Sequence, residues 1–205
     1  MSNNGWLQMI ENNPEHSQWY IDRFEKMAQE GRDLNGEARL IDAMVKRNSR
    51  ILDAGCGPGR VGGQLALLGH DVLGVDLDSK LIDKAKSEYP GAKWLTQDLS
   101  ELNLSPSDAP NEFDCIVCAG NVMTFLDPET RCDVIGNLAK YLAPGGRLVI
   151  GFGADRGYEF DDFFKDAKSV GLKEQLNLST WDILPFEKTS MFLVAIFTLD
   201  LPASS

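Results

Sequence analysis

Histidine is scarce in this sequence, and long apolar runs are absent. Only His16 and His70 occur among 205 residues, so few imidazoles are available as a general base or as metal ligands. No apolar stretch approaches the roughly 20 residues that cross a bilayer, and the first residues lack the charged and apolar blocks of a secretion signal. We therefore expect a cytoplasmic protein with no membrane partner.

Basic residues are also in short supply. The chain has 20 Lys and Arg against 31 Asp and Glu, which gives a formal net charge of −11 at pH 7. Such a surface gains little from counterion release on nucleic acid and is not attracted to anionic lipid headgroups. Nucleic acid is therefore not an expected partner.

Cysteine is limited to four residues, and their spacing predicts neither a disulfide framework nor a metal site. Cys115 and Cys118 have the C-x-x-C spacing, but they lie in the strand-like run 113–118. Side chains three positions apart in a strand point to opposite faces. We therefore interpret both as buried structural residues and expect no bound metal.

The apolar pattern predicts one α/β domain. With 205 residues and 43% apolar content, the chain can bury one core but is short for two domains. Strand-like and helical patterns alternate along it. Strands are expected at 50–53, 71–76, 92–95, 113–118, 146–151, 172–180 and 191–199, and helices at 15–30, 37–46, 61–68, 79–89, 129–142 and 160–170, with Ser79 as a helix cap and a loop through Pro106 and Pro110.

This alternation also predicts the topology of the sheet. Strands that alternate with helices form a parallel sheet with right-handed crossovers and helices on both faces. The last two strands are joined only by residues 181–190, without a helix, so they must be antiparallel. The expected fold class is a doubly wound, Rossmann-like α/β domain with an antiparallel strand pair at its end.

A glycine-rich loop follows the first strand, where doubly wound sheets bind ligands. It reads Asp53-Ala54-Gly55-Cys56-Gly57-Pro58-Gly59-Arg60. The dinucleotide fingerprint G-x-G-x-x-G needs a third glycine where this chain has Arg60. Asp76 ends the second strand about twenty residues on, where a carboxylate can accept both hydroxyls of a ribose. The alternatives for these features are a tight turn without a ligand and a capping aspartate.

Five motifs in order resemble those of class I S-adenosylmethionine-dependent methyltransferases over nearly all of residues 36–199. They are Ile51-Leu52-Asp53-Ala54-Gly55-Cys56-Gly57-Pro58-Gly59, Gly74-Val75-Asp76-Leu77-Asp78, Thr96-Gln97-Asp98-Leu99, the run 113–121 and Leu142-Ala143-Pro144-Gly145-Gly146-Arg147-Leu148. The resemblance implies a seven-stranded sheet in the order 3-2-1-4-5-7-6, with strand 7 antiparallel. It also implies S-adenosylmethionine as the cofactor and S-adenosylhomocysteine as the product.

The resemblance assigns roles at the cofactor site. Asp76 is expected to bind the ribose, and Leu77 is expected to contact the adenine face. Asp98 is expected to accept a hydrogen bond from the adenine amino group, with the backbone NH of Leu99 near the ring. The expected cofactor-binding residues are Asp53, Gly55, Cys56, Gly57, Asp76, Leu77, Asp98, Leu99, Ala119 and Asn121.

No catalytic base can be named from the sequence. His70 precedes the second strand, at the end of the sheet away from the ligand, and is expected at the surface. His16 precedes the N-terminal helix and is expected in solvent, with a position facing the pocket as the alternative. A sulfonium is already a strong electrophile, so the protein's main task is to align the acceptor and exclude water. The chain has almost no insertion beyond the core, which favours a small-molecule acceptor.

The first 35 residues precede the recognised core and carry apolar side chains that must cover something. We expect one domain over residues 1–205, in which residues 1–35 form a helical lid on the core at 36–199. The alternative is a helix packed against the outer helices of the sheet. The aromatic candidates for the acceptor pocket are Trp19, Tyr20, Phe24, Trp181 and Phe186, with ordinary packing as the alternative.

Two other function classes stay open. A non-catalytic protein that binds S-adenosylmethionine or a partner is one of them, because the fold requires no diagnostic catalytic residue. A nicotinamide-dependent oxidoreductase shares the architecture and the use of Asp76, but it needs the missing third glycine.

Overall fold

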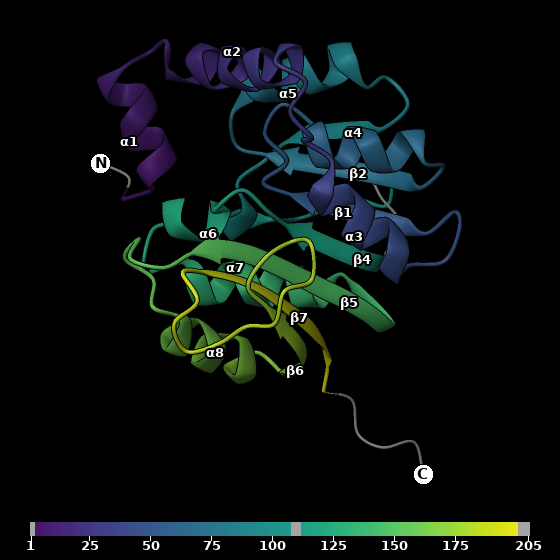
Figure 1. The fold of residues 1–205 in the computed structure, drawn as a ribbon, viewed down its shortest axis with the longest axis vertical. Coiled ribbons are helices and arrows are strands. Elements are labelled where there is room, and N and C mark those ends of the chain that lie inside the picture. Colours follow the sequence, from purple (N-terminus) through teal and green to yellow (C-terminus); the bar gives the residue numbers. More distant parts are fainter. Residues whose placement is uncertain (1–2, 108–111, 201–205) are drawn as a thin grey trace.

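The computed structural model describes residues 3–107 and 112–200 and places helices on both faces of a central sheet (Figure 1). The strands are β1 (Arg50–Ala54), β2 (Asp71–Asp76), β3 (Lys93–Thr96), β4 (Phe113–Cys118), β5 (Leu142–Gly153), β6 (Leu172–Leu178) and β7 (Phe192–Leu199). The helices are α1 (Gly5–Asn12), α2 (His16–Gln29), α3 (Gly36–Met44), α4 (Arg60–Leu67), α5 (Ser79–Glu88), α6 (Val122–Phe125), α7 (Arg131–Lys140) and α8 (Phe160–Ser169), with a short 3-10 helix η1 (Leu99–Glu101). Of the loop expected through Pro106 and Pro110, the second proline lies outside the described residues.

The seven strands lie in the order β3-β2-β1-β4-β5-β7-β6, as predicted. Strands β1 to β5 pair in parallel, and β7 runs antiparallel to both of its neighbours, β5 and β6. The short connection after β6 leaves no room for a crossover helix, so the chain returns as a hairpin. The doubly wound fold class and its strand order are therefore confirmed.

Side-chain alternation along β1 divides the core between the two faces of the sheet. Leu52 packs in one cluster with Leu138 of α7, and Ile51 packs in another with Ile41 of α3 and Leu65 of α4. All five side chains are completely buried, and each contributes about 1.5–3 kcal/mol by leaving water. With both faces covered, the ends of the strands are where the sheet can receive a ligand.

The two cysteines of β4 follow the same alternation. Cys115 lies in the cluster beneath α3 and α4, and Cys118 lies in the cluster beneath α7. Both are fully buried and unpaired, and burial raises the pKa of each thiol above its ordinary value. Their predicted burial on opposite faces of the sheet is confirmed.

The expectation that His70 lies at the surface is wrong. Its side chain is completely buried, and its Nε2 atom lies 2.9 Å from Oδ1 of Asp42 on α3. This contact ties the turn before β2 to α3. His70 still lies at the end of the sheet away from the cleft described below.

Several elements differ from the predicted ones, including α6 and η1, which were not expected. Helix α1 was not expected; it begins after Asn4, whose Oδ1 accepts from the backbone NH groups of Trp6 and Leu7 at 3.0 and 3.2 Å. Helix α5 is capped by Asp78 rather than Ser79, because the carboxylate accepts from the NH of Lys80 at 2.9 Å. Strand β5 begins at residue 142, before the glycine turn.

No helix within the described ranges is long and apolar enough to span a membrane.

Candidate functional site

A cleft that is open to solvent lies at the carboxyl ends of β1 to β4. Helices α1, α2 and α6 border it on the side away from the sheet (Figure 1). Nine of the ten predicted cofactor residues line this cleft: Asp53, Gly55, Cys56, Gly57, Asp76, Leu77, Asp98, Leu99 and Ala119. The structure therefore brings together residues from four strands that lie up to 66 positions apart in the chain, Asp53 and Ala119 being the extremes.

Asn121 is the predicted residue that does not line the cleft. Its Oδ1 accepts a hydrogen bond from the backbone NH of Gly153 at 2.8 Å. The side chain thus ties the end of β4 to the end of β5. The backbone of Asn121 is left-handed, with φ of 66°, and it precedes α6. The position of Asn121 in the motif could not show that its side-chain amide forms a hydrogen bond within the protein.

The glycine loop is held in shape by its own backbone. The NH groups of Gly55 and Cys56 both donate to the carbonyl of Val75, at 2.8 and 3.0 Å. Gly55 has φ of 74°, and a Cβ at this position would lie 2.4 Å from a methyl carbon of Val122. Glycine is therefore required at residue 55 both for backbone conformation and for the close approach of α6.

Asp76 joins this loop to β2. Its Oδ2 accepts from the NH of Gly57 at 2.8 Å, and its Oδ1 accepts from the NH of Asp78 at 2.9 Å. Burial raises the pKa of Asp76 to about 6, although the backbone donors at Asp78 and Gly57 act in the opposite direction. A carboxylate has about four lone-pair sites, so each oxygen keeps capacity for a further donor from a ligand.

Asp53 lies deeper, with only 2% of its surface exposed. Its Oδ2 accepts from the NH of Gly62 in the first turn of α4, at 2.7 Å. Burial raises the pKa of Asp53 to about 7, while the Gly62 hydrogen bond and the charge of Arg60 lower it. A carboxylate of this kind changes charge near neutral pH.

Asp98 ends the loop after β3 and caps the 3-10 helix η1. Its Oδ1 accepts from both the NH and the Oγ of Ser100, at 2.8 and 2.9 Å. These two hydrogen bonds orient the carboxylate, and neither of them involves Oδ2. Within the described residues, no group of three or more His, Cys, Asp or Glu side chains is placed to hold a metal ion.

The N-terminal residues supply the opposite wall of the cleft. Asn4, Trp6, Tyr20 and Phe24 all line it, together with Phe125 of α6. The rings touch edge to face: Trp6 lies 5.1 Å from Tyr20 and 5.8 Å from Phe125, measured between centroids. Such pairs favour a defined arrangement of the rings. The cleft is thus polar on the sheet side and aromatic on the N-terminal side.

Tyr20 and Phe24 were among the five aromatic candidates, whereas the other three lie elsewhere. Trp19 is 52% exposed. Trp181 packs on Gly151 of β5, and Phe186 contacts Phe160 at 5.6 Å. Sequence reasoning missed Trp6 and Phe125. The only available signal for Trp6 was Asn4, a typical helix cap placed before an apolar run.

Comparison with known proteins identifies relatives of this chain. A family model described as "Methyltransferase domain" matches residues 51–146. The solved structure of a TehB-like SAM-dependent methyltransferase from Corynebacterium glutamicum is 50% identical, with a TM-score of 0.87, and the match covers 91% of this chain and 100% of that one. The CcbJ methyltransferase from Streptomyces caelestis shares the fold at 16% identity, with a TM-score of 0.72 over 81% of this chain and 90% of that one.

Curated relatives match this chain over only part of their length. The uncharacterized methyltransferase Rv0089 of Mycobacterium tuberculosis is 31% identical over 115 residues, which are 54% of this chain and 54% of that protein. The chain spans about half to two thirds of the length of the curated relatives it matches. The relative from Corynebacterium glutamicum, by contrast, is covered completely and shares half of the aligned residues. This chain therefore belongs to the family of S-adenosylmethionine-dependent methyltransferases.

Proposed function

We propose that this chain transfers a methyl group from S-adenosylmethionine to a small-molecule acceptor. The observation that carries the proposal is the meeting of Asp53, Asp76 and Asp98 with the glycine loop in one cleft. Asp76 has accepting capacity left on both oxygens. The loop also exposes backbone without a Cβ at Gly55 and Gly57. These features fit a ligand that combines a ribose, an amino-substituted ring and a positive charge.

Each carboxylate has a distinct task in this proposal. Asp76 accepts hydrogen bonds from the ribose hydroxyls, and Asp98 accepts one from the adenine amino group through Oδ2. Asp53 places negative charge beneath the loop at the methionine end. When bound, S-adenosylmethionine supplies an electrophilic methyl group on a positively charged sulfur. The protein then has to hold the acceptor in line with that methyl group and keep water away.

The N-terminal residues are proposed to form the lid and part of the acceptor pocket. The ring of Tyr20 lies 3.7 Å from the position that a Cβ of Gly57 would take, and its hydroxyl lies 4.0 Å from that of Gly120. Tyr20 therefore reaches from the end of β1 to the end of β4. Burial raises the pKa of its hydroxyl, so the group is neutral at physiological pH. It can orient an acceptor by hydrogen bonding, but it is not a ready base.

The size and charge of the cleft favour a small acceptor over a polymer. Trp6, Phe24 and Phe125 make its outer wall apolar. Arg60 is the cationic side chain among the lining residues, and its charge is paired with Glu37 at 2.6 Å. The side chains that line the cleft therefore offer no unpaired cation to the phosphates of a nucleic acid.

Two measurements test the proposed function. Isothermal calorimetry on the purified chain should show binding of S-adenosylmethionine and S-adenosylhomocysteine and no heat with NAD, because Arg60 occupies the place of the dinucleotide glycine. Transfer of radiolabelled methyl groups should then be followed over a panel of small amines, phenols, thiols and carboxylic acids. Binding of NAD alone would overturn the proposal. Cofactor binding with no transfer to any class of acceptor would favour a non-catalytic binding protein.

A further inference from the structure

The N-terminal segment, defined as residues 3–37, is held near its beginning by Asp78. Oδ2 of this buried carboxylate accepts from Nε1 of Trp6 at 3.0 Å and from Oγ of Ser17 at 2.5 Å. Its Oδ1 caps α5 through the NH of Lys80. One side chain thus holds α1 and α2 together and attaches both to α5, and hydrogen bonds to a charged acceptor in a buried site are strong.

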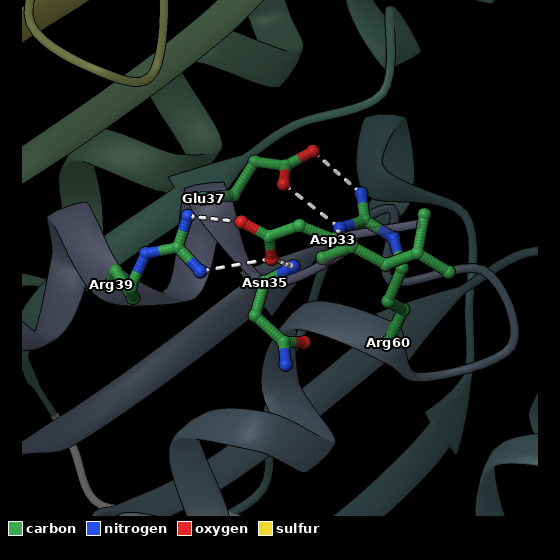
Figure 2. Close-up of polar contacts among 6 residues, drawn as sticks. Asp33, Asn35, Glu37, Arg39 and Arg60 are labelled. Carbon is green, nitrogen blue, oxygen red and sulfur yellow. Dashed lines mark hydrogen bonds and ion pairs between the residues drawn. The ribbon is translucent and has the colours of Figure 1, made fainter. Parts of the chain in front are cut away.

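The same segment is fastened at its end by Arg60. Figure 2 shows the guanidinium facing the carboxylate of Glu37, with two N–O distances of 2.8 and 2.6 Å. Nη1 also donates to the carbonyl of Leu34, and the guanidinium lies 5.4 Å from the ring centroid of Phe24. The side chains of Arg60 and Glu37 are each only 18% exposed. This bidentate ion pair is better shielded from solvent than an ordinary surface ion pair.

Both anchors are next to the loops expected to bind the cofactor. Arg60 directly follows the glycine loop, and its side chain lines the cleft. Asp78 lies two residues after Asp76, and its backbone NH donates to Oδ1 of that carboxylate at 2.9 Å. A shift of either loop therefore shifts an attachment point of the N-terminal segment.

From this arrangement we infer that Arg60 and Asp78 are positioning residues of the cofactor site. Each fastens one end of the N-terminal segment to one cofactor loop, through Glu37 and through Ser17 with Trp6. The inference rests on the proposed function. It adds that Ser17 and Glu37, which do not line the cleft, set the affinity for S-adenosylmethionine. Loops and segment then form one thermodynamic unit, in which closing the segment and binding the cofactor favour each other.

The contacts made by Asp78 and by Arg60 can be weakened separately with small substitutions. Ser17→Ala removes one hydrogen bond to Asp78, and Glu37→Gln removes the charge that pairs with Arg60. Each variant should bind S-adenosylmethionine about five- to fiftyfold more weakly by calorimetry, which lies within the usual range of coupling between sites. The matched control is Arg39→Gln, which breaks the neighbouring pair with Asp33 (Figure 2); both partners are 60% exposed, so affinity should be unchanged.

The pH dependence of the affinity for S-adenosylmethionine distinguishes a positioning role of Arg60 and Glu37 from general damage to the fold. The charged groups acting on Asp53 are Arg60, Asp76 and Glu37; the nearby thiols of Cys56 and Cys118 are protonated. Arg60 lowers the pKa of Asp53 and Glu37 raises it. The midpoint of the affinity profile should therefore move to higher pH in Arg60→Gln and to lower pH in Glu37→Gln. A general loss of structure would not shift the two midpoints in opposite directions.

Thermal melting of each cofactor-free variant accompanies these titrations. The inference is supported if the affinities fall while the variants melt cooperatively and the midpoints separate as stated. It is overturned if Ser17→Ala and Glu37→Gln fold and bind S-adenosylmethionine like the unmodified protein. It is also overturned if affinity and melting temperature fall together with an unchanged pH profile. Absence of binding by the unmodified chain would instead reject the proposed function.

Discussion

The indole of Trp94 lies directly on Gly74, so close that a Cβ at residue 74 would meet the ring at 2.2 Å. The same ring lies 2.9 Å from the Cβ position of Gly59 in the cofactor loop. Its Nε1 donates to the carbonyl of Tyr89 at 2.9 Å, which fixes the ring in place. Trp94 of β3 is thus packed against both β2 and the glycine loop.

Gly74→Ala should destabilise the protein by about 1–3 kcal/mol, because the added methyl group cannot enter without moving a hydrogen-bonded indole. Urea unfolding, followed by circular dichroism, measures the change. Gly91→Ala is the control, since nothing lies within 4 Å of the added Cβ there. Equal stability of the two variants would show that the Trp94 ring moves freely.

Asp76→Ala should weaken binding of S-adenosylmethionine by at least about tenfold. The substitution removes two hydrogen bonds to the ribose, each worth on the order of 1.5–3 kcal/mol before water compensates. Calorimetry gives the dissociation constant. Asp71→Ala, at the exposed beginning of the same strand, is the matched control. An unchanged affinity for the Asp76 variant would mean that the ribose is held elsewhere.

Asp53→Asn should stabilise the cofactor-free protein above neutral pH. Burial raises the folded-state pKa of Asp53 to about 7, well above the value of roughly 3.9 that is usual for an aspartate, so the native state binds the extra proton between these limits. Stability then falls as pH rises from about 4 to 7. Removing the ionisation should recover on the order of 2–4 kcal/mol at pH 8. Thermal melts from pH 4 to 8 test this, and a parallel decline in both proteins would contradict it.

Nucleic acid should not be retained by the purified chain at moderate salt. A net charge of −11 opposes the release of counterions that drives such binding. Fluorescence anisotropy with labelled duplex and single-stranded oligonucleotides measures this, with a basic DNA-binding protein as the positive control. Salt-dependent binding would reveal a basic patch that the charge balance conceals.

Cysteine reactivity should follow burial. Cys132 is the partly exposed thiol, whereas Cys56, Cys115 and Cys118 are buried and burial raises the pKa of each. Reactivity depends on thiolate and access, so iodoacetamide should label Cys132 first in the native protein. Peptide mass spectrometry identifies the order. Early labelling of Cys115 would show that β4 opens readily.

The sequence was sufficient to predict the sheet and most of the cleft floor. Asp53 and Asp76 lie at the ends of β1 and β2, and Asp98 follows β3; strand ends in a parallel sheet meet by topology alone. The N-terminal wall could not be predicted in this way. Trp6 meets Asp78 across 72 positions, and nothing in the local pattern of either residue specifies its partner. Asn121 illustrates a related limit, because an amide at a strand end can serve the protein, as it does toward Gly153, or a ligand.

The order of the strands also constrains how the sheet is completed during synthesis. β6 is an edge strand whose neighbour in the sheet is β7, and β7 leaves the ribosome later. β6 therefore cannot join the sheet until β7 has been made and inserted beside β5. A chain stopped anywhere between residues 179 and 191 would lose two strands rather than one. Its β5, which pairs with β7 along six residues, would then present a bare edge to other nascent chains.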